Sequence, residues 1–236
     1  MAEGDMGDIS ELLNAWPFDP GSTQVRLIEA ADGRPLLQVR VPLGVLQLEM
    51  SGRPDGRPSV LDAIGAGPDE LAPEVCAAVR DEIHLRHQRA AALLAIDRFD
   101  EAERDVGWNL HAIDMLWRHG AESLDRRLAA RLRPSVLTMR ARTEVARAVR
   151  SGRLSIALEA VAHALADIRV DAEAGHIDLD ADAEHEVRTL EALREALVPK
   201  LPASQRVELE DRLRAAIANE NFELAAILRD ELRLLG

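Results

Sequence analysis

Few residues in this chain have the type and spacing that catalysis or metal binding requires. His84 and His87 lie three residues apart in a helical segment, with Asp81 and Glu82 one turn earlier. Histidines at this spacing can share a helix face and bind a metal ion. Because no convincing third ligand accompanies them, we expect a solvated or capping role and no metal site.

The pattern Asp178-x-Asp180-x-Asp182 begins like a calcium-binding loop. It has Ala183 where such a loop needs glycine and Thr189 where it needs the closing glutamate. We therefore predict an acidic loop in which Asp180 or Asp182 caps the next helix.

Other catalytic signatures are missing from the sequence. It contains no GxxxxGK[ST] phosphate loop, no cysteine pair, and no Ser-His-Asp or Cys-His arrangement with recognisable local sequence. The single cysteine, Cys76, lies among Val75, Ala77 and Ala78 and is predicted to be a small core residue. We expect a protein that is not an enzyme and that binds no cofactor.

Trp108 and Trp117 lie nine residues apart on one predicted helix. Core packing is the default expectation for both, and an exposed tryptophan that anchors a partner on a concave surface is the alternative.

The charges are distributed unevenly. The net charge of −13 argues against general nucleic-acid binding, yet residues 118–153 hold ten arginines against three carboxylates, and residues 167–195 hold ten carboxylates against three arginines. One interpretation is that these are solvated helix faces that attract each other. The alternative is a DNA-contacting helix over 126–153. Its candidate residues would be Arg140, Arg142, Arg147 and Arg150.

The elements that would position these residues are mostly helices. Aromatic residues make up only 3% of the chain, so the core must consist of Leu, Ala, Val and Ile, which suits packed helices. Apolar periodicity predicts long helices over 74–96, 99–118, 122–150, 154–168, 180–197, 204–218 and 222–234.

The first seventy residues show a different pattern. A short helix is expected over 10–15, and alternating apolar residues predict strands over 25–30, 37–41 and 45–50, the first two joined by a turn at Asp32-Gly33. Because two or three strands cannot bury a core alone, we expect them to pack against the first long helices.

One turn pattern recurs three times, at 97–102, 152–157 and 220–225. Each copy places a bulky apolar residue, Phe99, Leu154 or Phe222, three positions before an alanine. We predict that the alanine allows close approach of two helices and that the bulky residue fills the gap at the turn. The flanking small residues of the first two copies resemble a degenerate tetratricopeptide repeat. The fold class is therefore predicted as mainly α: an array of helical hairpins with a small N-terminal β-meander.

Residues 207–235 read VELEDRLRAAIANENFELAAILRDELRLL and look like the UVR motif, which is named for excinuclease subunits B and C. The resemblance implies a C-terminal helix-loop-helix that binds a partner protein or pairs with another such hairpin, and it implies no chemistry. The segment LGVLQLEMSGRPDGRP also resembles bacterial proteins of unassigned activity that end in such a hairpin. The partner-binding residues implied are Leu209, Leu213, Phe222, Ala225, Arg229, Asp230 and Leu232. The alternative is that the hairpin packs on its own domain and that its charges are solvated.

These observations predict an adaptor protein with three parts: strands over 1–72, a helical body over 73–200 and the hairpin over 203–236. The runner-up hypothesis is an accessory factor of nucleotide excision repair that contacts DNA through 126–153. A lone cysteine, an acidic N-terminus without an apolar signal region, and no apolar run longer than 90–96 predict a cytoplasmic protein that does not associate with membranes. The resemblance to the bacterial proteins that end in such a hairpin implies that it is bacterial.

Overall fold

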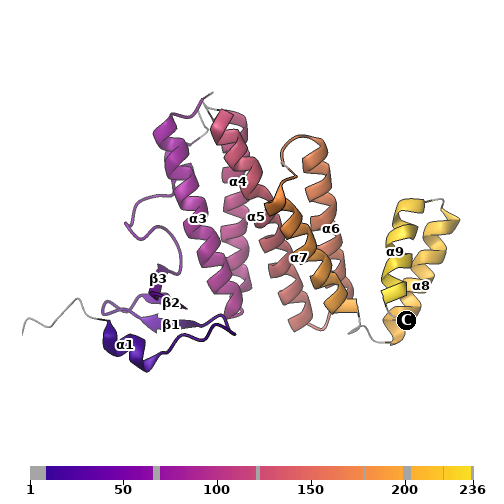
Figure 1. Ribbon diagram of the computed structural model, residues 1–236, viewed down its shortest axis with the longest axis horizontal. Coiled ribbons are helices and arrows are strands. Elements are labelled where there is room, and N and C mark those ends of the chain that lie inside the picture. The colour runs from indigo at the N-terminus through magenta and orange to yellow at the C-terminus, as the bar shows by residue number, and fades with distance from the viewer. Residues whose placement is uncertain are drawn as a thin grey trace, which may run out of the picture. The chain divides into compact units, whose positions relative to one another are not determined.

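The computed structural model describes residues 9–65, 70–120, 123–177, 179–198, 203–219 and 221–234. The chain forms two compact units, 1–112 and 113–236, with the boundary inside one long helix. The described residues are mostly helical, with one small sheet in the first unit (Figure 1). The mainly α class with an N-terminal sheet is confirmed, whereas the predicted three-part division stays a prediction.

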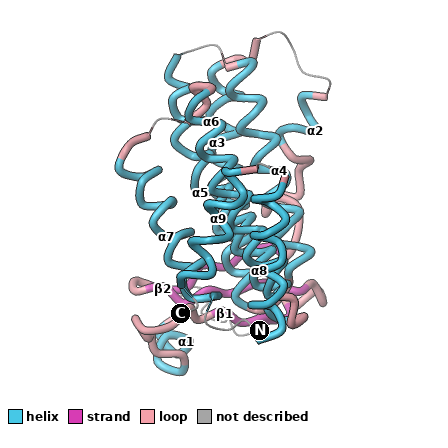
Figure 2. The backbone as a smooth tube through the Cα atoms, turned by 90° about the vertical axis from the view of Figure 1, so that its right-hand side faces the viewer, coloured by secondary structure: helices cyan, strands magenta, loops and turns pink. Residues whose placement is uncertain are grey.

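The first unit begins with α1 (Ser10–Ala15) and a three-stranded antiparallel sheet in the order β1-β2-β3. The strands are β1 (Val25–Glu29), β2 (Pro35–Val41) and β3 (Gly44–Glu49), shown in magenta in Figure 2. Leu37 pairs with Leu27 on one side and with Leu48 on the other. Leu37 and Leu48 are buried, and so are Leu36 and Gln38 on the opposite face of β2, so both faces of this strand are covered. The three predicted strands are confirmed.

The helices of the first unit are α2 (Val60–Ile64), α3 (Pro73–Ala95) and the start of α4 (Phe99–His119). Helix α2 is not among the predicted helices, because its five residues are too few to show helical periodicity. Its N-cap Ser59 accepts a hydrogen bond from the Asp62 amide at 3.1 Å.

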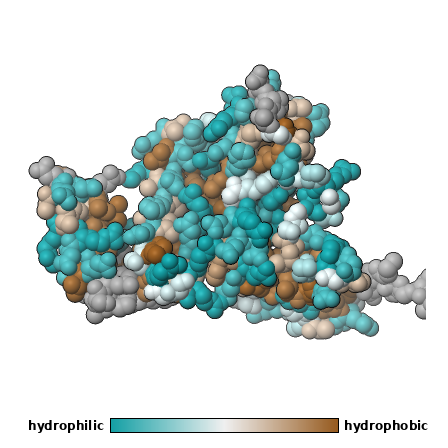
Figure 3. All heavy atoms as spheres, turned by 180° about the vertical axis from the view of Figure 1, so that it is seen from behind, coloured by the Kyte–Doolittle hydropathy of each residue, from teal (hydrophilic) through white to brown (hydrophobic). Residues whose placement is uncertain are grey.

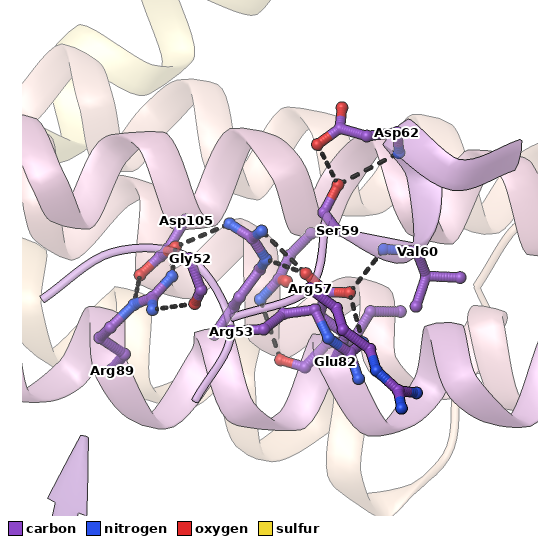
Figure 4. A network of polar contacts seen from close by, with 12 residues as sticks. Gly52, Arg53, Arg57, Ser59, Val60, Asp62, Glu82, Arg89 and Asp105 are labelled. Carbon is purple, nitrogen blue, oxygen red and sulfur yellow. Dashed lines mark hydrogen bonds and ion pairs between the residues drawn. The ribbon is translucent and has the colours of Figure 1, made fainter. Parts of the chain in front are cut away.

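The loop after β3 is attached to α3 by buried charges (Figure 4). The Glu82 carboxylate accepts bonds from the Val60 amide at 2.8 Å and from Arg53 at 3.1 Å. Two turns further along α3, Arg89 donates to the Gly52 carbonyl at 2.7 Å and to Asp105 of α4 at 2.6 Å. The loop therefore contacts the first long helix, whereas the packing of the strands themselves against the first helices stays a prediction.

The second unit continues from the end of α4 with α5 (Ser123–Arg150), α6 (Leu154–Glu173) and α7 (Ala181–Leu197), which pack on one another. The chain ends with α8 (Ala203–Ala218) and α9 (Phe222–Leu234), which pair with each other. The predicted helices are confirmed, although α6 extends five residues beyond its predicted end. Asp180 caps α7 as expected, accepting bonds from the amides of Asp182 and Ala183 at 3.0 Å. Asp178 lies outside the described residues.

The recurring turn is closed by the same backbone hydrogen bond in all three hairpins. An amide donates to the carbonyl five residues earlier in each: Arg98 to Leu93 at 2.9 Å, Arg153 to Ala148 at 2.8 Å, and Asn221 to Ala216 at 2.9 Å. This is the bond that closes a Schellman-type helix end. The left-handed residue that such an end requires is Asp97 (φ 61°) in the first copy and Gly152 (φ 69°) in the second.

The alanines of the pattern behave as predicted and the bulky residues do not. Ala102, Ala157 and Ala225 are all buried, each nine residues after a buried Leu93, Ala148 or Ala216. Phe99 and Leu154 are half-buried, but Phe222 is 68% exposed, so the prediction that it fills the gap at its turn is wrong. In a hairpin of two short helices the shared core ends before the turn, which leaves this side chain outside it. The likeness to a tetratricopeptide repeat stays a prediction.

Candidate partner-binding hairpin

The C-terminal hairpin is built around a small core of its own. Leu209 and Ala216 of α8 pack against Ala225 and Leu228 of α9. Leu213 and Leu232 are partly buried against this cluster. Asn221 starts α9: its side-chain oxygen accepts the Leu224 amide at 3.2 Å, and its carbonyl accepts the Ala225 amide at 3.0 Å.

Four of the predicted partner-binding residues therefore have a role inside the hairpin. Leu209 and Ala225 are buried in its core, and Leu213 and Leu232 flank the core. Their side chains hold the two helices together, so any surface that they offer to a partner is small.

The exposed apolar side chains of the hairpin are different ones. Among the apolar side chains that the structure describes there, Phe222 is the most exposed, and Val207, Ile217 and Leu224 are also exposed. In Figure 3 the hairpin lies at the left edge, where apolar residues are visible on its surface. Phe222 is the one predicted partner-binding residue that is both apolar and open to solvent.

The predicted pair Arg229 and Asp230 lies on the outside of α9. Arg229 is exposed and Asp230 half-exposed, and their side chains contact each other at 3.4 Å. The interpretation that two buried charges among apolar neighbours need a partner does not fit this placement. Both charges are solvated.

The buried charge of the hairpin is the next residue, Glu231, which the sequence analysis missed. It is 6% exposed and lies in a cavity of about 220 Å³ between the hairpin and α6. Burial raises the pKa of the Glu231 carboxyl above its ordinary value, Arg194 and Arg212 lower it in part, and Glu159 raises it further. In the motif, Glu231 follows two other charged residues on the same helix. Only its position one turn after the buried Leu228, on the same face of the helix, could have predicted its burial.

The walls of this cavity are mainly apolar. On the α6 side it is lined by Leu158, Ala162 and Ala166, and on the hairpin side by Leu224, Ile227 and Leu228. Arg212 of α8 and Glu159 of α6 form an ion pair at 3.3 Å at its edge, with both side chains partly exposed. An exposed pair of this kind contributes at most about 1 kcal/mol.

The candidate nucleic-acid residues are partly neutralised by carboxylates of the same unit. Arg140 forms an ion pair with Asp167. Its neighbours Arg131 and Arg133 on α5 bind Asp182 at 2.8 Å and Asp171 at 2.6 Å. Of the other candidates, Arg142 and Arg150 are exposed and Arg147 is half-buried. The interpretation that the basic and acidic stretches attract each other agrees with these three pairs.

The remaining candidates for chemistry are dispersed. His84 is exposed on α3, whereas Glu82, one turn earlier, is buried in the Arg53 contact. Within the described ranges no group of three or more His, Cys, Asp or Glu residues is placed to bind a metal ion. Cys76 is fully buried, as predicted for a core residue.

The two tryptophans are both half-buried. Arg86 lies over the Trp108 ring at 4.2 Å, and Trp117 meets the edge of the His176 ring at 4.9 Å. Neither is an open anchor of the kind that the alternative interpretation requires.

Comparison with protein families gives one match. Residues 204–236 match the family model described as UvrB/uvrC motif, which covers α8 and α9 and 33 of the 236 residues. Neither the curated proteins nor the solved structures returned a match for this chain. Among the described helices, none has the length and apolar character needed to cross a membrane. The resemblance of the C-terminal hairpin to the UVR motif is thus confirmed.

Proposed function

We propose that this chain is a non-catalytic adaptor protein that recruits a protein partner through its C-terminal hairpin. The observation that carries the proposal is the match to an interaction motif over a hairpin whose turn presents an exposed phenylalanine. An exposed aromatic side chain leaves apolar surface in contact with water. A partner that covers this surface removes it from water, and this favours binding. No element of the proposal requires a metal or a cofactor.

The core of the hairpin supports this division of roles. Leu209, Ala216, Ala225 and Leu228 give the two helices a fixed geometry, because their side chains are covered by each other. Ile217, Phe222 and Leu224 then lie near the turn on a preformed scaffold, so little conformational entropy is lost when a partner covers them. The likeness of the helices over 73–200 to a repeat array is part of this proposal, and so is a cytoplasmic bacterial setting.

Affinity capture from native lysate tests the proposal. Wild type is compared with Phe222→Asp, which places a charge at the exposed turn, and with Leu43→Asp as a matched control. Leu43 is 99% exposed in the turn between β2 and β3, so both substitutions put an aspartate on the surface. Circular dichroism must first show equal helix content.

We expect wild type and Leu43→Asp to capture the same protein and Phe222→Asp to lose it. The captured protein is then purified, and its affinity for all three chains is measured directly. Equal affinities for the three chains would show that the hairpin turn does not bind this partner.

The alternative role, contact with DNA through 126–153, has less support. Arg131, Arg133 and Arg140 are already paired with carboxylates, and a chain of net charge −13 repels a polyanion. Titration of duplex DNA at low ionic strength decides the matter: salt-sensitive binding that Arg142→Glu weakens would favour this alternative.

A further inference from the structure

Three Gly-Arg-Pro triplets occur in the first unit, at 33–35, 52–54 and 56–58. Their glycines, Gly33, Gly52 and Gly56, all adopt positive φ, at 83°, 70° and 68°. Side-chain-bearing residues rarely adopt this backbone conformation, so each glycine permits a sharp turn directly before its arginine. The first and third triplets are also preceded by aspartate.

The two Asp-Gly-Arg-Pro segments make the same turn. The Asp32 carboxylate accepts the backbone amide of Arg34 at 3.1 Å, and the Asp55 carboxylate accepts that of Arg57 at 3.2 Å. The segments are separated by 23 positions, since 55 − 32 = 23, and belong to different loops. The same local geometry therefore presents an arginine twice.

All three arginines line one cavity of about 390 Å³. Arg34, Arg53 and Arg57 contribute to its wall, and Glu49 is the one carboxylate residue among the residues that line it. The wall itself carries three guanidinium groups and one carboxylate, and three more carboxylates, Asp32, Asp55 and Glu82, contact these arginines from outside the lining.

The other carboxylates near the arginines hold them in place from outside the lining. Arg53 donates through Nε and Nη2 to Asp55, at 3.1 and 3.0 Å, and through Nη1 to the buried Glu82 at 3.1 Å. The bond from Arg53 lowers the pKa of Asp55 to about 2, so this carboxylate stays ionised. Arg34 is held likewise by Asp32 at 2.6 Å. Such contacts fix the orientation of guanidinium groups before a ligand arrives.

Part of the donor capacity of the arginines is not used by the described residues. Each guanidinium has five N–H donors. Arg57 makes no guanidinium hydrogen bond within the described ranges, its nearest carboxylate oxygen is 3.9 Å away, and its side chain is 80% exposed. Arg34 uses Nε and Nη1 but not Nη2, and its side chain is 56% exposed.

We propose that this cavity binds the phosphate group of a small anionic ligand. Guanidinium groups recognise phosphate through paired, charge-assisted hydrogen bonds, and a phosphate has enough oxygens to accept from all three arginines. The volume is in the range of small-molecule sites. A nucleic acid backbone would need an extended basic surface, which the chain as a whole does not offer.

Titration calorimetry with inorganic phosphate and with pyrophosphate, at constant ionic strength, tests the proposal on the full chain. We expect saturable binding to one site, at least tenfold weaker in Arg57→Gln and in Arg34→Gln. Arg188→Gln is the matched control, because Arg188 is 63% exposed and contacts a single carboxylate at 3.6 Å in the second unit. Arg57 makes no hydrogen bond through its guanidinium to any described residue, so its substitution should leave the fold intact, which circular dichroism checks.

Three results would overturn the proposal: no saturable binding of either probe, equal weakening in Arg57→Gln and Arg188→Gln, or tight binding of a 12-nucleotide single strand without binding of the short phosphates. The last result would instead point to a nucleic acid backbone. The Phe222→Asp chain should bind phosphate like wild type, so this test and that of the hairpin fail independently.

Discussion

The α3/α4 and α8/α9 hairpins close with the same turn but treat their buried charges in opposite ways. In the first, the carboxylates of Glu82 and Asp105 are enclosed by arginines at 2.6 to 3.1 Å. In the second, the buried Glu231 has no hydrogen bond or close ion pair from any described residue. The guanidinium groups around the buried carboxylates of the first hairpin stabilise these charges. The buried carboxylate of the second hairpin has no such contact with the described residues, so its burial lowers the stability of that hairpin.

The two hairpins also differ in how far the phenylalanine at their turn is exposed. Phe99 is half-buried at its turn, whereas Phe222 is mostly exposed. One turn sequence thus serves two purposes: at 97–102 its phenylalanine is half-buried in the interior of a unit, and at 220–225 its phenylalanine is exposed to solvent.

Asp105→Asn is expected to have the largest effect, because it leaves the buried guanidinium group of Arg89 without its counter-charge and removes one of the two carboxylates that bind Arg86. The loss in the free energy of unfolding should be about 3–5 kcal/mol, measured by urea titration. Glu184→Gln, in an exposed pair with Arg188, is the control and should change stability by less than about 0.5 kcal/mol. A small loss for Asp105→Asn would show that the first hairpin is not held by its charges.

Ala225→Leu should separate the helices of the second hairpin, since Ala225 lies in the core where they approach each other closely. We expect a loss of about 1–3 kcal/mol in the stability of the hairpin, seen as faster hydrogen exchange of the amides in α8 and α9. Ala215→Leu, at an exposed position of α8, should leave exchange unchanged. If both variants exchange alike, the alanine does not set the helix spacing.

Glu231→Gln should stabilise the hairpin by about 1 kcal/mol at neutral pH, because it removes a charge whose burial Arg194 and Arg212 offset only in part. The pKa of Glu231 is raised in the folded chain, so the folded state binds the proton more tightly than the unfolded state does. The stabilisation of the folded wild type by this tighter proton binding is therefore fully present below the ordinary pKa of glutamate. It is lost as the pH rises through the folded-state pKa.

The difference between Glu231→Gln and wild type should accordingly disappear toward acidic pH. Thermal unfolding of both chains at several pH values measures it. A difference that does not vary with pH would mean that Glu231 is solvated.

Arg140→Gln should have the smallest effect, less than about 1 kcal/mol, because the Arg140 and Asp167 side chains are both partly exposed. A double-mutant cycle with Asp167→Asn measures the coupling, which should decrease with added salt. Strong, salt-independent coupling would place this pair with the buried charges of the first hairpin.

Much of the fold could be predicted from local patterns. The long helices, the three strands and the recurring turn all follow from periodicity, from glycine positions and from small residues at fixed spacing. The burial of Cys76 and the cap at Asp180 could be predicted because each depends on neighbours close in sequence.

The rest depends on contacts between residues far apart in the chain. Arg53 meets Glu82 across 29 positions, and Arg34, Arg53 and Arg57 meet at one cavity only because the sheet pairs β2 with β3. The exposure of Phe222 and the burial of Glu231 depend on which helices surround the hairpin. Periodicity within one helix could not determine this.

The most direct test of the central claim is site-specific photo-crosslinking in cells with a benzophenone amino acid in place of Phe222. The same residue in place of Leu43 serves as the control, since Leu43 is even more exposed. We expect position 222 to give one discrete adduct with a partner protein and position 43 to give none. No adduct at 222, or the same adducts from both positions, would contradict the claim that the exposed turn of the hairpin is the partner-binding surface.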